Sequence, residues 1–309
     1  MKSRNYKTRK PEVVGFGALN MDLLHQVDSI AGADEETFIK NVTTSCGGSA
    51  ANTIIGLSKL GLKTGYIGKV ATDSPGKLLK NNLIKENVDT THLLISPDGR
   101  SGQVMGFIDS KGQRALYVDP GVNDDIHISD IDLEYVNQSQ VLHLTSFVGD
   151  SFKTQLKLLG ELEDDLVLSF DPGRIYVEKG RKALEKIIER TDILLINEIE
   201  LQILMGYSSY QESAIELQKQ GLKIVVVKRG AEGVYATSPE NEVELPPFPV
   251  ECQDSTGAGD AFNAGFLYAH LNHFSLKESC RSGNLIASKC IQSKGATSGL
   301  PDNSIFENF

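Results

Sequence analysis

The sequence lacks any surplus of positive charge. It has 31 lysines and arginines against 41 aspartates and glutamates, which gives a net charge of −10 at neutral pH. Nucleic-acid phosphates attract clustered basic side chains, so this balance argues against a nucleic-acid-binding protein. Basic residues cluster in the first ten positions alone, and no apolar run follows them as in a secretion signal. We expect residues 1–11 to form a disordered basic leader.

Long apolar runs and paired cysteine motifs are also missing. No run reaches the roughly 18 residues of a membrane-spanning helix, so we expect no membrane contact. The four cysteines have no CxxC spacing, which disfavours a disulfide framework or a cysteine-based metal site. These features predict reduced thiols in a cytoplasmic protein.

Short apolar runs alternate with segments of helical period along most of the chain. Strands are expected at 13–17, 64–70, 141–144, 166–170, 193–196 and 224–227. Helices are expected at 50–60, 75–86, 151–162, 178–189 and 213–220. This rhythm predicts an α/β fold with a mainly parallel sheet covered by helices on both faces.

Two stretches interrupt the alternation. Residues 37–44 and 103–118 read as extended strands, and SKGQ at 110–113 is typical of a hairpin turn. Strands without intervening helices do not easily join a parallel sheet. We therefore expect a small separate β-layer that acts as a lid over a site.

The segment DSTGAGD at 254–260 precedes an apolar, helix-forming run at 261–272. Gly257, Ala258 and Gly259 would then lie at a helix N-terminus, where backbone amides and the helix dipole favour an anion. Asp260 beside them would take a proton from an attacking hydroxyl in phosphoryl transfer. The alternative is structural: Asp260 favours the helix start and the glycines make a tight turn.

The segment CGGSAAN at 46–52 precedes the first expected helix. Gly47 and Gly48 open space along the backbone, and the amide of Asn52 can both donate to and accept from polyol hydroxyls. An ordinary loop with Ser49 as helix cap is an equally good interpretation of this segment alone.

Two further pairs carry polar side chains. Asn20 and Asp22, at the end of the first strand, would face the same pocket, because ligands gather outside the strand C-termini of such sheets. Asn197 and Glu200 form a capping-box pattern after the strand at 193–196. The same pair could order water around a Mg²⁺-nucleotide, and both interpretations can hold together.

Other nucleotide motifs are absent or broken. There is no GxxxxGK[ST] and no HRD or DFG set. GFGALN at 15–20 nearly matches the dinucleotide fingerprint, but Asn20 replaces its third glycine and Asp22 would face the pyrophosphate. A nicotinamide oxidoreductase is therefore disfavoured. A catalytically silent binding protein is the other alternative, which the intact Asp260 and glycine turn argue against.

Two motifs resemble those of the ribokinase-like, or PfkB, carbohydrate and nucleoside kinases. They are GGSAAN with LSKLG at 47–61 and DSTGAGDAF at 254–262; NEIE at 197–200, KRGAEG at 228–233 and KGA at 294–296 are also similar. The resemblance runs from about residue 13 to 301. It implies one kinase domain over 12–309, with a three-layer αβα core and a small β-sheet lid at about 32–46 and 100–121. It further implies transfer of the ATP γ-phosphoryl group to a hydroxymethyl group, and often a homodimer formed through the lid.

The resemblance also implies roles for individual residues. Asp260 matches the base, and the anion hole matches Gly257, Ala258 and Gly259. Contacts to substrate hydroxyls match Asn20, Asp22, Gly47, Gly48 and Asn52. The ATP side matches Lys228, Gly230, Gly233 and Asn284, with Mg²⁺ ordered through water by Asn197 and Glu200. Some members hold a monovalent cation such as K⁺ at the positions of Asp254, Thr256, Cys290, Ser293, Gly295 and Gly299, although Ser293 and Gly299 depart from the ribokinase pattern.

The acceptor stays open between a sugar, which we favour, and a nucleoside. DPGVN at 119–123 resembles the lid-end segment of sugar kinases, whereas SFDPG at 169–173 and GSAANT at 48–53 also resemble archaeal-type nucleoside kinases. LHLT at 142–145 lacks the glutamate of ribokinase proper, which disfavours ribose. A base would need an apolar wall, for which Phe16, Phe107 and Phe147 are candidates that equally suit core or lid packing.

Overall fold

A large central sheet organises the chain in a computed structural model that describes residues 10–206 and 209–307. Residues 1–9 of the expected leader lie outside the described residues. Pro11 is already buried, and the backbone amide of Glu12 donates to the carbonyl of Lys63 at 2.7 Å. Packed structure therefore begins before residue 12.

The central sheet is mainly parallel, which confirms the prediction from the strand–helix alternation. Within the described residues it has nine strands, in the order β13 (Glu242–Leu245), β12 (Val234–Thr237), β11 (Ile224–Lys228), β10 (Ile193–Asn197), β9 (Val167–Asp171), β8 (Val141–Thr145), β1 (Val13–Phe16), β4 (Thr64–Ala71) and β5 (Leu93–Ser96). Strands β12 and β13 are antiparallel to their neighbours and form an edge hairpin that the sequence did not predict.

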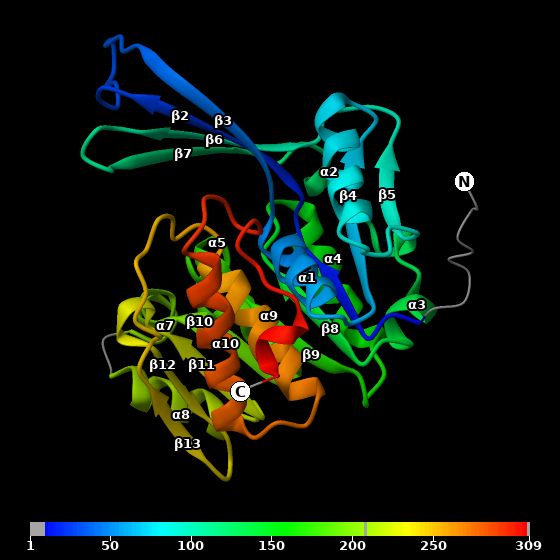
Figure 1. Cartoon of the computed structure of the whole chain (residues 1–309). Helices are drawn as coiled ribbons and strands as arrows, with labels where there is room; N and C mark the ends of the chain where they lie inside the picture. Colours follow the sequence, from blue (N-terminus) through cyan, green and yellow to red (C-terminus); the bar gives the residue numbers. More distant parts are fainter. Residues whose placement is uncertain (1–9, 207–208, 308–309) are drawn as a thin grey trace.

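Helices cover both faces of this sheet and make the three-layer arrangement (Figure 1). One face carries α1 (Ser49–Lys59), α2 (Ser74–Lys85), α9 (Ala258–Leu271) and α10 (Leu276–Cys290). The other carries α3 (Leu133–Asn137), α4 (Asp150–Leu158), α5 (Gly173–Val177), α6 (Arg181–Arg190), α7 (Glu198–Met205) and α8 (Tyr210–Lys219). The expected helix at 178–189 begins late, because Gly180 adopts a φ of 81° between α5 and α6.

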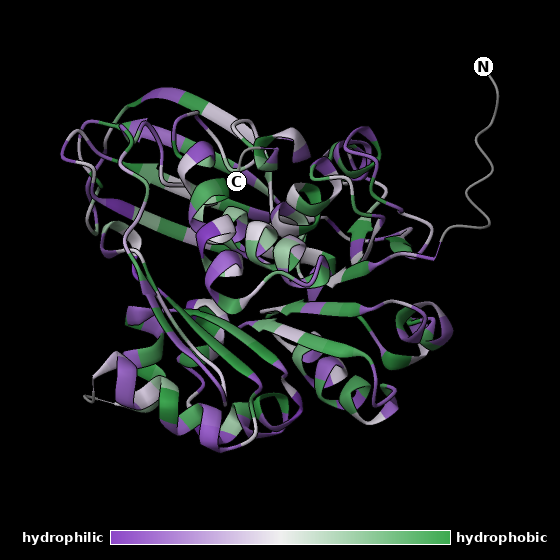
Figure 2. Ribbon diagram, turned by 60° about the horizontal axis from the view of Figure 1, so that its bottom comes forward, coloured by the Kyte–Doolittle hydropathy of each residue, from purple (hydrophilic) through white to green (hydrophobic). Residues whose placement is uncertain are grey.

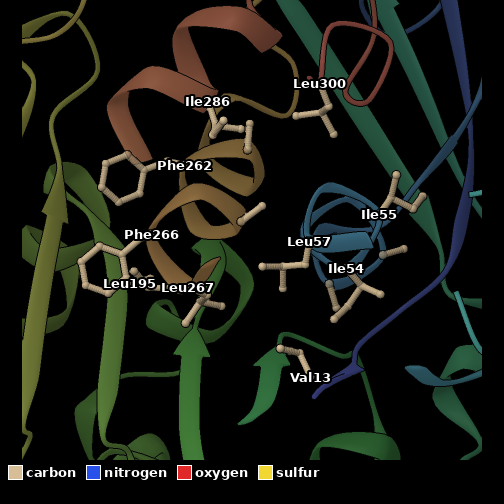
Figure 3. Packing of buried hydrophobic residues seen from close by; sticks show 14 of the residues in the cluster. Val13, Ile54, Ile55, Leu57, Leu195, Phe262, Phe266, Leu267, Ile286 and Leu300 are labelled. Atoms are coloured by element: carbon tan, nitrogen blue, oxygen red, sulfur yellow. The ribbon is translucent and has the colours of Figure 1, made fainter. Parts of the chain in front are cut away.

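Each face of the sheet has its own apolar core. Leu195 of β10 packs on the α9 side, whereas its neighbours Leu194 and Ile196 pack on the other side. Strands buried on both faces need continuous apolar runs, and the central strands in Figure 2 are largely hydrophobic. Figure 3 shows side chains of α1 and α9 filling the space above Val13.

A second, smaller sheet stands apart from the central one as the predicted lid (Figure 1). Its strand order is β3 (Ile39–Gly47), β2 (Asn20–Val27), β6 (Gly102–Ile108) and β7 (Arg114–Asp119). Strands β6 and β7 form the expected hairpin, and the backbone amide of Gly112 closes its turn on the carbonyl of Asp109 at 3.0 Å.

Strand β2 corrects the sequence analysis. Asn20 and Asp22 were expected at the end of the first strand, but β1 ends at Phe16 and both residues lie on β2. This strand also lies outside the expected lid segments at 32–46 and 100–121. The sequence of β2 does not predict a lid strand, because apolar side chains point to both of its faces and apolar and polar residues do not alternate.

Strand β1 is the point where the strand order of the central sheet reverses. Its two neighbours are β4 and β8, and ligands of open α/β sheets bind outside the strand C-termini at such a point. The lid begins soon after β1, and β3 leads into α1 at Gly48. The lid and the start of α1 therefore lie at the same edge of the sheet.

Candidate active site

The glycine turn at residues 257–259 opens α9, as predicted. Gly257 precedes the helix with a φ of 77°, a left-handed conformation that favours glycine. A methyl group on it would lie 2.5 Å from the Cβ of Ala296. The first amides of a helix have no partner within the helix, so this turn presents donors suited to an anion.

Asp260 lies half-buried in the first turn of α9 and faces α1. The Nδ2 of Asn52 donates to its Oδ2 at 2.8 Å, and the hydroxyl of Thr53 donates to its carbonyl at 3.4 Å. Burial raises the pKa of Asp260 to about 7, and the hydrogen bond from Asn52 opposes this rise. A carboxylate with such a pKa can take up a proton near neutral pH.

A buried cluster of three side chains joins β9, β11 and α9. The Nζ of Lys228 donates to Asp171 Oδ2 at 2.6 Å and to Asn263 Oδ1 at 3.2 Å. The Nδ2 of Asn263 donates to the same oxygen of Asp171 at 2.7 Å. Burial would raise the pKa of Asp171, but Lys228 holds it below its usual range. The charge of Asp171 raises the pKa of Asp260 and that of Lys228 lowers it, so this cluster tunes the carboxylate of Asp260.

Asn197 and Glu200 form the predicted capping box of α7. Glu200 donates its backbone amide to Asn197 Oδ1 at 2.8 Å, and Asn197 donates its own to Glu200 Oε2 at 3.1 Å. In the parallel register, Asn197 pairs with Lys228. Burial, and then the charge of Asp171, raise the pKa of Glu200.

A cavity of about 320 Å³ lies between the lid and the start of α9. Its lining includes Asp260 and four of the predicted substrate-binding residues: Asn20, Asp22, Gly48 and Asn52. The fifth, Gly47, is not among the lining residues. A side chain at Gly47 would collide with the carboxylate of Asp22, so this glycine leaves room for that carboxylate.

The start of α1 decides between the two interpretations of residues 46–52. No side chain caps this helix, and Ser49 lines the cavity instead of acting as the cap. Gly48 adopts a φ of 120°, and any side chain on it would collide with the carbonyl oxygen of Ala18. The segment therefore brings the backbone close to the lid strand at the cavity wall.

Asn123 also lines this cavity and was missed as a site residue. Its Nδ2 donates to Asn20 Oδ1 at 3.1 Å and to the carbonyl of Leu19 at 2.8 Å, while its Oδ1 accepts from the amide of Leu19 at 3.0 Å. These bonds fix Asn20 beside Asp22, whose pKa burial raises to about 6. The signal in the sequence was the segment DPGVN at 119–123, which contains Asn123 and resembles the lid-end segment of sugar kinases.

Apolar side chains complete the wall of the first cavity. They are Leu24, Val104, Ile108, Leu116 and Val118 from the lid, and Phe147, Val148 and Ile175 from the core. Of the three aromatic candidates for a base-stacking wall, Phe147 lines the cavity. Phe16 is buried in the core, and Phe107 stacks on His25 within the lid with ring centres 4.9 Å apart.

A second cavity, of about 490 Å³, contains the predicted nucleotide-binding residues Lys228, Gly230, Gly233 and Asn284. Its apolar lining includes Phe248, Val250, Phe262 and Ile291. Asn197 and Glu200 do not line it. The two cavities meet at the glycine turn, because Gly257 and Asp260 line the first whereas Ala258 and Gly259 line the second.

Comparison with known proteins identifies the family. The sequence model of a protein family described as pfkB family carbohydrate kinase matches residues 10–303 of this chain. The chain belongs to this family. Its members are ATP-dependent phosphotransferases, and so is this pfkB kinase.

Relatives and solved structures resemble the pfkB kinase over most of its length. An uncharacterized sugar kinase of Archaeoglobus fulgidus is 42% identical over 251 residues, which are 80% of this chain and 98% of the relative. The ATP-dependent ribose-1-phosphate kinase of Halopiger xanaduensis is 29% identical over 286 residues, 93% of this chain and 94% of the relative. The ribokinase of Arabidopsis thaliana complexed with ribose and ATP superposes with a TM-score of 0.85, at 25% identity, over 96% of this chain and 97% of the other. The ribokinase fold is thereby confirmed.

The predicted cation-binding residues of the pfkB kinase come together in part. Asp254 accepts from the amide of Thr256 at 2.9 Å and from the amide of Gly295 at 2.8 Å. The Sγ of Cys290 lies 3.6 Å from the carbonyl oxygen of Thr256 and 3.3 Å from that of Ala296. These contacts tie the loop after α10 to the glycine turn. The same loop carries Ser293 and Gly299.

Over residues 10–206 and 209–307, no helix of the kinase has the length and apolar character needed to cross a bilayer. The same residues contain no group of three or more histidine, cysteine or acidic side chains arranged to hold a metal ion directly. Its cysteines are free thiols.

Proposed function

We propose that this pfkB kinase transfers the γ-phosphoryl group of ATP to a hydroxymethyl group of a small sugar, with Asp260 as general base. The observation that carries the proposal is the position of Asp260 where the two cavities meet. An acceptor hydroxyl in the first cavity would face this carboxylate. ATP in the second cavity would present its γ-phosphate to the turn at residues 257–259.

The chain supplies three functions in this reaction. Asp260 accepts the hydroxyl proton as the acceptor oxygen bonds to the γ-phosphorus and the bond from that phosphorus to ADP breaks. The amides and the dipole at the start of α9 stabilise the charge on the transferred phosphoryl oxygens. The lid excludes water, which would otherwise compete with the sugar for the phosphoryl group.

Mg²⁺ that arrives with ATP would neutralise phosphate charge during the transfer. Asn197 and Glu200 fit such an ion through water molecules, because Mg²⁺ usually keeps several of its waters. Glu200 supports this role as a buried carboxylate at the first turn of α7, beside the strand end that carries Lys228.

The first cavity favours a sugar over a nucleoside. Its volume of about 320 Å³ lies at the small end of the roughly 300–1,000 Å³ typical of ligand pockets. The amides of Asn20 and Asn52 and the carboxylate of Asp22 can pair with several hydroxyl groups. A nucleoside is the second candidate, because Phe147 and the apolar lid side chains would give a base a wall to pack on.

An ADP-release assay over pentoses, hexoses, keto-deoxy sugars and nucleosides tests this function. We expect turnover with a sugar, and a loss of kcat of at least about 10²-fold in Asp260→Asn, with acceptor binding retained. No ADP release with any acceptor would contradict the kinase activity, and near-normal turnover of Asp260→Asn would remove Asp260 as the base. Turnover confined to nucleosides would replace the sugar by the second candidate.

Three finer features belong to the same proposal. A monovalent cation such as K⁺ binds beside Asp254, Thr256 and Gly295, near the carbonyl oxygens of Thr256 and Ala296. If this is wrong, exchange of K⁺ for tetramethylammonium would leave kcat unchanged.

The kinase forms a homodimer through the lid. It works in the cytoplasm, where ATP is plentiful and thiols stay reduced; fractionation of cells that make the protein would test this location.

A further inference from the structure

Arg114 opens strand β7 on the cavity side of the lid. It pairs with Ile108 in the antiparallel register, and both residues line the first cavity. Side chains alternate along a strand, so Leu116 and Val118 share this face and line the cavity as well. A guanidinium thus stands at one end of a wall that is otherwise apolar along β7.

The charge of Arg114 has no protein partner among residues 10–206 and 209–307. The other arginines within these ranges do have partners: Arg100 contacts Asp119, Arg174 contacts Glu178, Arg181 contacts Glu216, Arg190 contacts Asp192, Arg229 contacts Glu198 and Glu244, and Arg281 is also engaged.

Asp109 and Asp119 are the carboxylates nearest to Arg114 along the chain, five positions away on either side, and both are already engaged. Asp119 pairs with Arg100. Asp109 lies in the hairpin turn. Its Oδ1 accepts from the backbone amides of Lys111 at 2.8 Å and Gln113 at 2.9 Å, which holds the hairpin turn. The hairpin therefore leaves the guanidinium of Arg114 available for an anion that does not belong to the protein.

The carboxylates of the cavity lie toward its opposite end. Asp22 pairs with Val104, and Val104 pairs with Val118, so Asp22 lies level with Val118 rather than with Arg114. Val118 lies four positions after Arg114 along β7, which is about 13 Å at the usual rise of a strand. The long side chain of Arg114 can cover part of this length, so an acceptor whose hydroxyl faces Asp260 can reach it with its far end.

We propose that Arg114 binds an anionic group at the far end of the acceptor, so that the preferred substrate is a sugar bearing a phosphate or a carboxylate. The inference rests on the proposed kinase function and narrows its substrate class. A planar guanidinium can bind either oxyanion through two parallel hydrogen bonds. Of the described residues that line the cavity, Arg114 is the one with a cationic side chain, whereas Asp22 and Asp260 are acidic.

Matched pairs of acceptors test the proposal. A pentose is compared with its 1-phosphate, and a hexose with the corresponding sugar acid, in kcat/KM and in calorimetric binding without ATP. We expect one anionic member to exceed its neutral counterpart by at least roughly 10-fold, as for a hydrogen bond to a charged group. The pair that shows this preference tells whether the oxyanion is a phosphate or a carboxylate.

Variants then assign the preference to Arg114. Arg114→Gln should raise KM and Kd for the anionic acceptor by about 10- to 100-fold, with little change in kcat or in the neutral acceptor, and Arg114→Lys should restore part of the loss. Lys111→Gln removes an equal charge from the neighbouring turn, outside the cavity lining, and should change neither value.

Equal or tighter binding of neutral acceptors would overturn the inference, and so would an Arg114→Gln variant that affects both members of a pair equally. The calorimetric arm separates this result from a failure of the proposed function. Anion-dependent binding without ADP release would support the role of Arg114 and contradict the kinase activity. Turnover of neutral sugars alone would support the kinase activity and contradict the role of Arg114.

Discussion

Asp260 illustrates how one side chain acquires its chemistry from its neighbours. Burial raises its pKa, whereas Asn52 and Lys228 pull that pKa back toward the usual range. The result, about 7, leaves the carboxylate divided between its two protonation states near neutral pH. Asp260 lies where the two cavities meet, so this proton affinity suits the proposed role as general base.

We predict that kcat/KM rises with pH up to about 7 and is level above it, because protonated Asp260 cannot accept the hydroxyl proton. Below the pKa the rise should approach tenfold per pH unit. A pH profile of kcat/KM measures it. A level profile across this range would contradict a raised pKa at the base.

The stability of Asp260→Asn provides an independent control. The folded protein holds the Asp260 proton more tightly than an unfolded chain does, so ionisation of this group costs stability as pH rises from about 4 to 7. Asparagine removes this cost while it preserves the shape of the site. The Tm of the variant should exceed that of the parent above about pH 7, and the difference should shrink toward pH 5.

Most of the site residues that were predictable from the sequence lie within short contiguous motifs. Asp260 and Asn52 belong to contiguous motifs, and the structure joins them by a hydrogen bond. Asp171 and Asn263 could not be assigned to the site in this way. Asp171 on β9 and Asn263 on α9 contact Lys228, but these two elements lie far apart in the sequence. The periodicity of a sequence does not predict contacts between distant elements.

At the scale of elements, the start of α9 is fixed by a steric limit. Gly257 is left-handed and lies tightly against Ala296, so both its backbone and its surroundings exclude a side chain. The position of Asp260 depends on this turn, because the carboxylate is one helical turn away.

We predict that Gly257→Ala lowers kcat by about 10- to 10²-fold, since small displacements of catalytic groups have effects of that size. The methyl group would push the loop at Ala296 and shift the first turn of α9. Gly160→Ala is the matched control, because a Cβ at Gly160 meets no atom within 4 Å and should leave kcat unchanged. Steady-state kinetics compares the two variants, and similar losses in both would contradict the steric explanation.

Elements with a clear sequence pattern were predictable, and elements without such a pattern were not. The parallel strands carry continuous apolar runs, and the capping box of α7 has a spacing visible in the sequence. Strand β2 has neither feature, and its residues Asn20 and Asp22 were predicted to lie at the end of β1. The hairpin β12–β13 was not predicted, because its second strand is short and half-exposed at the edge of the sheet.

The whole molecule combines a buried core with a lid that exposes apolar side chains. Phe38, Val42 and Tyr117 are 85%, 48% and 59% exposed, and all belong to lid strands or their flanks. Edge strands β3 and β7 also leave backbone groups open to another chain. Such a surface suits the proposed homodimer.

We predict that light scattering gives the mass of a dimer for the parent protein and of a monomer for Val42→Asp. A carboxylate in an apolar interface would be buried without a partner, which disfavours association. Ile199→Asp is the control, because Ile199 is 64% exposed on α7, which packs on the central sheet and its helices. A monomeric parent, or equal dissociation of both variants, would contradict a dimer formed through the lid.

The alternation of side chains along β7 has a consequence for how such kinases diversify. In the proposed reaction the catalytic groups lie on the core, whereas Arg114, Leu116 and Val118 line the proposed acceptor cavity from one short strand. After gene duplication, a copy could exchange one metabolite for another through substitutions at alternate positions of this strand. These side chains are exposed rather than part of the buried core, so such substitutions should cost the fold little stability.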